Sequence, residues 1–195
     1  MRYSTDHKRR TQERIIGAAA TAFRRHGYAA TGIDAVMASA KLTAGAFYAH
    51  FRSKQELLTA AVDQAFRESR RGWPKELKQL RGRAWVRQFI SFYLSAGHRD
   101  APTTGCPMPS LAAEIRRNGN PVRRVFERRL SELVEAVARE MNGAAPDRAR
   151  AISAIALSVG GLMLARGVKD AAFSDEILAS CRTMLTEGLI GPEAS

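Results

Sequence analysis

The segment from Thr43 to His50 carries side chains suited to contact with nucleic-acid bases and phosphates. On a helical wheel Ala44, Gly45 and Tyr48 share one arc, whereas the two residues after Gly45 turn toward the protein interior. Small residues at the start of this arc let the backbone approach base edges. There Thr43 can hydrogen-bond and the Ala44 methyl can touch a thymine methyl. Tyr48 and His50 can then reach base edges or phosphates.

Further polar and basic residues flank this segment. Thr31 and Lys54 stand at the expected starts of two helices, where backbone N–H groups favour phosphate oxygens. The run 8–10 (KRR) is predicted to form a basic arm that follows the DNA backbone or enters the minor groove. The spacing of two short helices around residues 40–42 predicts a helix-turn-helix, whose second helix enters the major groove.

Residue types typical of enzymes occur without the required spacing. The chain has four His and two Cys, with no H-E-x-x-H pattern, no C-x-x-C pattern and no glycine-rich loop after a strand. The two thiols, Cys106 and Cys181, exclude a disulfide scaffold and a four-cysteine zinc site. The sequence therefore predicts no catalytic residues, no metal site and no cofactor.

The net charge indicates a polyanionic partner. The 195 residues include 31 Lys and Arg against 19 Asp and Glu, a formal charge of +12. Residues 1–71 carry a net +7 and residues 72–195 a net +5. We therefore expect nucleic acid as the first candidate partner and an acidic membrane surface as the second.

The hydrophobic periodicity predicts an all-α fold. The first helix is expected at 11–25 and is ended by Gly27. Thr31 begins a short second helix. Ser53 and Glu56 form a capping box that begins a longer helix. Gly and Pro within 70–74 mark the expected domain boundary, which divides the chain into a first domain, 8–71, with the expected helix-turn-helix, and a second domain, 72–195. The further expected helices span 83–96, 107–117, 120–142, 146–168 and 174–189.

The stretch 151–165 is apolar on nearly all sides. Its 15 residues fall short of the ~18 needed to span a bilayer, and no signal peptide is evident, so we expect a cytoplasmic protein with no membrane segment. A helix with no polar face must be covered on two sides. Core on one side and a second subunit on the other would explain this pattern.

Residues 11–66 resemble the DNA-binding domain of TetR-type (tetracycline-repressor-like) regulators. The resemblance rests on residues 14–19 (RIIGAA), Phe23, Gly27, Tyr28, Thr31, 47–51 (FYAHF), Ser53, Lys54, Leu57 and Leu58. It implies a DNA-binding domain over 8–71, made of a three-helix head and a connecting helix. It also implies a helical body over 72–195 that binds an effector and dimerises through its last two helices. The DNA contacts that it implies are Thr31, Thr43, Ala44, Gly45, Tyr48, His50 and Lys54. Lys41 is added to the candidate DNA-binding residues because of its charge.

Lys41 departs from the family pattern, which often has Gly in this turn. If the turn needs a left-handed backbone, Lys costs about 1 kcal/mol relative to Gly, although it adds a cation near the phosphates.

The candidate effector pocket is less specific, because core and cavity use the same apolar residues. Candidates are Trp85, Phe89, Phe92, Tyr93, Cys106, Met108, Leu111, Phe126 and Met163. Cys106 precedes a predicted helix start, where a helix dipole lowers the pKa of a thiol. Two roles are therefore open for Cys106: a redox sensor or an inert buried thiol. Arg123, Arg124, Arg128 and Arg129 are interpreted as a solvated helix face rather than a second nucleic-acid site.

These observations predict a ligand-responsive transcriptional repressor that binds a palindromic operator in double-stranded DNA as a homodimer and is released by a small molecule. The alternative is a sequence-independent DNA-binding protein driven by charge, which would bind all sequences similarly and weaken steeply with salt. An enzyme on a helical bundle is the third class, and it lacks the side-chain constellation that it would need.

Overall fold

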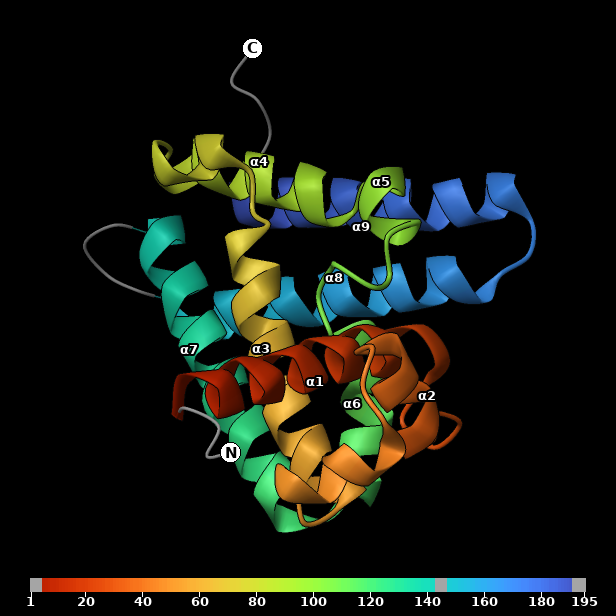
Figure 1. The fold of residues 1–195 in the computed structure, drawn as a ribbon. Coiled ribbons are helices and arrows are strands. Elements are labelled where there is room, and N and C mark those ends of the chain that lie inside the picture. The colour runs from red at the N-terminus through yellow and green to blue at the C-terminus, as the bar shows by residue number, and fades with distance from the viewer. Residues whose placement is uncertain (1–4, 143–146, 191–195) are drawn as a thin grey trace. The chain divides into compact units, whose positions relative to one another are not determined.

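The computed structural model describes residues 5–142 and 147–190, and every regular element in these residues is a helix (Figure 1). The all-α prediction is therefore confirmed for this part of the chain. The chain divides into two compact units. Unit 1 is Met1–Arg71 with Pro102–Arg129, and unit 2 is Gly72–Ala101 with Leu130–Ser195.

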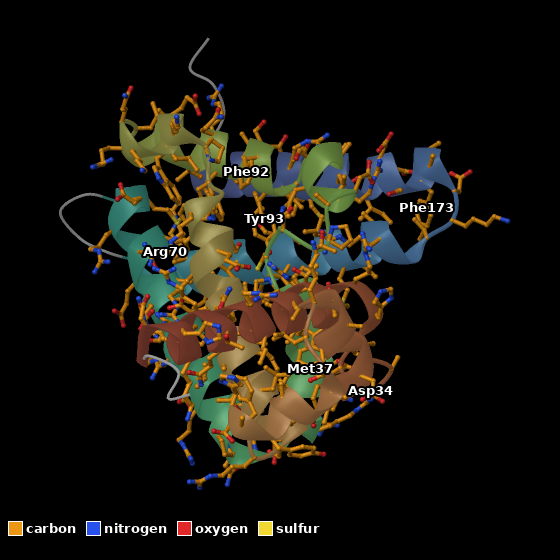
Figure 2. The ribbon with its side chains drawn as sticks, viewed as in Figure 1. Asp34, Met37, Arg70, Phe92, Tyr93 and Phe173 are labelled. Atoms are coloured by element: carbon orange, nitrogen blue, oxygen red, sulfur yellow. The ribbon has the colours of Figure 1, made fainter. Side chains whose placement is uncertain are left out.

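Unit 1 is built around a three-helix head. Phe23, Met37, Phe47 and Leu57 have no exposed surface and form the centre of its core (Met37 in Figure 2). Burial of each side chain of this size stabilises the folded state by roughly 1.5–3 kcal/mol relative to leaving it exposed. The elements are α1 (Thr5–His26), α2 (Ile33–Ser39), η1 (Ala44–Ala49), α3 (Lys54–Arg71), α6 (Met108–Arg117) and the first part of α7 (Gly119–Asn142).

Two predicted helix boundaries are confirmed by their geometry. Gly27 ends α1 with φ +80°, and its N–H donates to the Phe23 carbonyl at 3.0 Å. At the start of α3, the Ser53 hydroxyl accepts the Glu56 N–H at 3.1 Å. The Glu56 carboxylate accepts the Arg52 N–H at 2.8 Å, so both halves of a capping interaction are present.

Other predicted boundaries were wrong. The N-cap of α2 is Gly32 and not Thr31, because the Thr31 hydroxyl donates to the Gly27 carbonyl at 2.7 Å. α7 begins at Gly119, one residue before the predicted cap. The predicted start at Pro146 lies outside the described residues. Two short helices were missed, η2 (Lys75–Lys78) and α5 (Ala96–Arg99), because four residues are too few to show a helical period.

Residues 102–129 are tied to the head by polar contacts from α1 and the turn after it. The Arg24 guanidinium, only 2% exposed, donates to the Gly105 carbonyl at 3.2 Å and to the Glu68 carboxylate at 2.9 Å. Burial lowers the pKa of Arg24, and Glu68 opposes that shift. The Glu114 carboxylate accepts the N–H groups of Tyr28 and Ala29. These bonds satisfy backbone groups that follow the end of α1.

The compact units therefore differ from the predicted domains 8–71 and 72–195. The break at 71/72 coincides with the predicted boundary, but the segment 102–129 packs in unit 1. Hydrophobic periodicity locates helices along the chain and carries no information about such long-range contacts. The assignment of effector binding and dimerisation to 72–195 stays a prediction.

Unit 2 contains η2, α4 (Gly82–Tyr93), α5, the rest of α7, α8 (Arg148–Gly167) and α9 (Ala171–Ile190). Helices α8 and α9 pack closely, since a Cβ added at Gly161 would lie 2.6 Å from Cys181 Sγ. The Arg166 guanidinium donates to the carbonyls of His98 and Arg99, at 2.6 and 2.9 Å. These bonds fasten α5 to the end of α8.

Within the described residues, α8 is the one helix whose length and composition would allow it to cross a membrane. It spans 20 residues, longer than the apolar stretch recognised in the sequence. One face is buried in unit 2 through Ala154, Ile155 and Leu162, among others. A core helix of a soluble protein has the same length and composition, so α8 is weak support for a membrane segment.

Lys41 adopts the left-handed backbone conformation, with φ +55°. It is the one non-glycine residue with positive φ among those described. The Leu42 N–H donates to the Met37 carbonyl at 2.9 Å, which closes the turn between α2 and η1. The turn therefore requires the conformation that glycine adopts without a Cβ penalty.

We expect Lys41→Gly to raise the free energy of unfolding by about 1 kcal/mol, because relief of Cβ strain exceeds the extra entropy of the unfolded chain. Urea denaturation followed by circular dichroism measures the change. Lys41→Ala is the control, since it removes the charge and keeps the Cβ. Equal stability of the Gly and Ala variants would contradict the strain argument.

Candidate nucleic-acid interface

The segment 43–48 presents a small polar surface to solvent. Thr43, Ala44 and Gly45 are exposed, and Tyr48 is 72% exposed. Phe47 is completely buried and stacks on Phe51 with ring centroids 5.7 Å apart. The predicted division of this segment into an outward arc and an inward anchor is therefore confirmed.

The segment is a 3-10 helix rather than the predicted α-helix. Six residues are too few for an α-helix to be stable alone, and the tighter winding is common in short pieces. Thr43 stands at the N-cap with φ −76° and ψ 149°, but its side chain makes no capping hydrogen bond. Threonine is a favoured capping residue, so the sequence also predicts that the Thr43 side chain caps this helix; that expectation was wrong.

Tyr48 packs edge-on against Phe47, with ring centroids 5.1 Å apart and planes at 85°. This contact restricts the Tyr48 ring while the side chain stays open to solvent. No atom other than its chain neighbours would lie within 4 Å of a Cβ added at Gly45. The surface beside Tyr48 is thus open enough for the backbone to approach another molecule.

Thr31 and Lys54 lie at the edges of this surface in different environments. Thr31 is 4% exposed, and its hydroxyl is engaged by the Gly27 carbonyl. Lys54 is the first residue of α3, and its Nζ lies 4.3 Å from the centroid of the Tyr28 ring. That cation–π contact holds the ammonium group near the helix N-terminus, where phosphate oxygens are favoured.

His50 follows η1 with a partly buried ring. Burial lowers the pKa of the His50 imidazole, and the positive charges of Lys8 and His7 lower it further. The ring is therefore neutral at pH 7. A neutral imidazole still donates one hydrogen bond, so contact with a phosphate would be as a donor rather than as a cation.

Residues 8–10, predicted to form a basic arm, are helical, because α1 begins at Thr5 and not at residue 11 as predicted. Their contact with DNA stays a prediction. Arg9 pairs with Asp6 at 2.9 Å and with Glu13 at 3.4 Å, and Arg10 pairs with Asp6 at 3.0 Å. Residues one turn apart on a helix share a face, so these charges pair along α1.

The predicted effector-pocket residues fall into both units. Trp85 and Phe89 stack at 4.9 Å in the core of unit 2, followed by Tyr93, while Phe92 stacks on His98 at 5.6 Å (Phe92 and Tyr93 in Figure 2). In unit 1, Cys106, Met108 and Leu111 are buried, and Phe126 packs on Phe66. Met163 is 52% exposed on α8.

Neither unit by itself brings the predicted pocket set together. A hollow in unit 1 is lined mainly by α3 and α7, including Gln55, Thr59 and Asp63, and by none of the predicted pocket residues. No group of three His, Cys, Asp or Glu side chains is placed to hold a metal ion in residues 5–142 and 147–190. Burial raises the pKa of the Cys181 thiol, which keeps it protonated.

The head matches a known family. Residues 15–61 match the family of bacterial regulatory proteins named tetR. The Tn10 transposon protein TetC of Escherichia coli is 39% identical over 54 residues, which are 28% of this chain and 27% of that protein. The similarity to this curated relative is thus restricted to about a quarter of its length.

Solved structures extend the similarity to the whole fold. A TetR regulator from Chloroflexus aurantiacus superposes with a TM-score of 0.75 at 26% identity, over 94% of this chain and 98% of that one. A TetR-family regulator from Cytophaga hutchinsonii superposes with a TM-score of 0.76 at 22% identity, over 97% of this chain and 98% of that one. With the exposed helix-turn-helix of the head, these matches define the class as bacterial transcriptional regulators. Residues 15–61 carry the TetR-type DNA-binding domain, and the chain has the fold of TetR regulators over 94% of its length.

We expect Tyr48→Ala to weaken binding to a preferred DNA sequence by roughly 10- to 100-fold, since one good base contact contributes 1–3 kcal/mol. Thermal unfolding should change little, because Tyr48 is 72% exposed. Fluorescence anisotropy with labelled duplex measures the affinity. Tyr48→Phe separates the hydroxyl from the ring, and wild-type affinity in the Ala variant would exclude Tyr48 as a contact.

Proposed function

We propose that the protein is a ligand-responsive repressor that binds a palindromic operator as a homodimer in the cytoplasm. The observation that carries the proposal is the exposed surface Thr43, Ala44, Gly45 and Tyr48, held on the fully buried Phe47. A small start to the recognition helix permits close approach to base edges in the major groove. Lys41 and Lys54 flank that surface with positive charge.

The distribution of charge supports DNA as the partner of unit 1. Unit 1 contains 19 Lys and Arg against 8 Asp and Glu, a net +11, whereas unit 2 carries 12 against 11, a net +1. A net-positive surface raises the local concentration of a polyanion and steers its approach. Nearly all of the excess charge thus belongs to the unit that contains the helix-turn-helix.

An exposed apolar face on α8 and α9 supports dimerisation through these helices. Met163 and Leu164 on α8 are 52% and 58% exposed, and Phe173 and Met184 on α9 are 51% and 65% exposed (Phe173 in Figure 2). Large apolar side chains exposed on two neighbouring helices are typical of a protein–protein interface. A two-fold symmetric partner would cover it and would place two heads on two half-sites.

The buried aromatic residues of unit 2 support a hydrophobic effector. Trp73, Trp85, Phe89 and Tyr93 form one chain of ring contacts, with centroid distances of 4.9 to 6.0 Å. Clusters of this kind line ligand cavities in helical proteins when a ligand separates them. An effector would act by binding with different affinity to the DNA-binding and DNA-free states.

Genomic fragments selected at ~150 mM salt, a concentration that weakens phosphate-only binding, test the regulator hypothesis. We expect a small set of palindromic fragments to be enriched by the wild type and lost with Tyr48→Ala. Recovery of fragments without sequence preference would favour the alternative, charge-driven DNA binding, for which the +11 of unit 1 is the specific support.

We expect Leu164→Glu with Met184→Glu to convert the dimer into a monomer, because two carboxylates per chain cannot be buried unpaired in an apolar interface. Light scattering after gel filtration should then give the 21.4 kDa mass of one chain instead of twice that value. Ala84→Glu, an exposed position on α4, is the control. A dimer that persists in the double variant would contradict this interface.

A further inference from the structure

The junction of α6 and α7 carries a cluster of four exposed arginines. We define the α6–α7 corner as residues 116–124, which include Arg116 and Arg117 at the end of α6 and Arg123 and Arg124 near the start of α7. All four side chains are exposed. None of them makes an ion pair or hydrogen bond to the residues that the structure describes. Four guanidinium groups thus stand uncompensated on one corner of unit 1.

The two following arginines of α7 differ in this respect. Arg128 and Arg129 bind the Asp63 carboxylate at 3.0 and 2.7 Å. Burial of Asp63 acts to raise the pKa of its carboxyl, but Arg129, Arg67 and Arg128 lower it overall. These two arginines are therefore part of the packing of α7 on α3. The interpretation of all four arginines as a solvated helix face therefore fails for Arg128 and Arg129, which pair with Asp63. Arg123 and Arg124 are exposed to solvent, and their surface is open to a partner.

The α6–α7 corner is held against the first turn of α3. The Gln55 side-chain amide donates to the Asn118 carbonyl, and the Asn118 side chain donates to the Glu114 carbonyl at 2.8 Å. Gly119 has φ +76°, and a Cβ there would lie 2.7 Å from Gln55 Nε2. The Gln55 side chain therefore packs directly on Gly119, in addition to its hydrogen bond with Asn118.

This contact places the corner beside Lys54, the neighbour of Gln55 and one of the proposed DNA contacts. Within unit 1, η1 and the start of α7 lie at the same end of α3 (Figure 1). An extended arginine side chain reaches several ångströms beyond its helix, and guanidinium groups bind phosphate oxygens in bidentate fashion. The four arginines are thus suited to phosphates next to those reached from Lys54.

We propose that the α6–α7 corner is a second DNA-contacting surface, which binds the phosphate backbone flanking the base pairs read by η1. The proposal rests on the proposed function for its partner, and the corner adds affinity without adding sequence preference. Residues 102–129 also add positive charge to the unit that contains the helix-turn-helix, since their net +4 raises the +7 of residues 1–71 to +11.

The test compares two variants that each lose four positive charges. One is Arg116→Gln, Arg117→Gln, Arg123→Gln and Arg124→Gln at the corner. The matched control removes exposed charges of unit 2 by Lys75→Gln, Lys78→Gln, Arg83→Gln and Arg139→Gln. Affinity for the selected operator and for a random duplex of equal length is measured against salt concentration. Thermal unfolding of both variants checks that they fold.

We expect the corner variant to lose at least tenfold in affinity at ~150 mM salt on both duplexes. Its plot of log affinity against log salt should flatten by about 0.9 for each phosphate contact removed. The control should stay near the wild type. Hydroxyl-radical footprints at saturation should lose protection at the operator flanks and keep it at the centre. The pairs Arg116/Arg117 and Arg123/Arg124, changed separately, should each give part of the loss.

Equal losses in the corner and control variants would overturn the proposal, because net charge alone would then explain the effect. Wild-type slope and affinity in the corner variant would overturn it as well. If the wild type selects no operator but the corner variant still weakens binding to random duplex, the corner is supported and the regulator hypothesis fails. Absence of wild-type binding to any duplex would overturn both.

Discussion

Complete burial of Phe47 is the constraint on which the proposed DNA-reading surface depends. η1 has six residues and few internal hydrogen bonds, so it cannot hold its shape by helix propensity alone. Stacking of Phe47 on Phe51 fixes the rotation of the segment about its axis. That rotation decides that Ala44, Gly45 and Tyr48 face solvent. The direction of these exposed side chains is therefore set by tertiary packing of Phe47, because so short a helix is not stable by itself.

A second set of contacts attaches residues 102–118 to the three-helix head. Arg24 and Glu114 join α1 and the turn after it to residues 102–118, through carbonyl, carboxylate and backbone N–H partners. Buried charged groups that lose one partner leave the other unpaired, at a cost of several kcal/mol. Since Glu114 binds α6 to the turn before α2, a displacement of α6 would also move the start of the helix-turn-helix. The proposed response to an effector would use this connection.

The packing of residues 102–129 in unit 1 also changes how the net charge is divided between the two parts of the protein. Counted along the chain, the excess is divided as +7 for residues 1–71 and +5 for residues 72–195. Counted by compact unit it is +11 and +1. The signal for the α6–α7 corner was present in the sequence as two Arg-Arg pairs around a short Asn, Gly and Pro segment. Its significance depended on Gln55 and Gly119, which bring the corner to α3.

The sequence by itself determined the all-helical architecture, the C-terminal end of α1, the start of α3, and the inward and outward sides of η1. These depend on local periodicity, on Gly27 and on the capping residues Ser53 and Glu56, all of which act within one or two turns. Only the tertiary structure decided that Arg9 and Arg10 lie in α1, that Thr31 is buried, and that the predicted pocket residues divide between two units. It also separated Arg128 and Arg129, which pair with Asp63, from Arg123 and Arg124, which do not. The reason is physical: ion pairs and burial join residues far apart in the chain, and a local pattern carries no record of those partners.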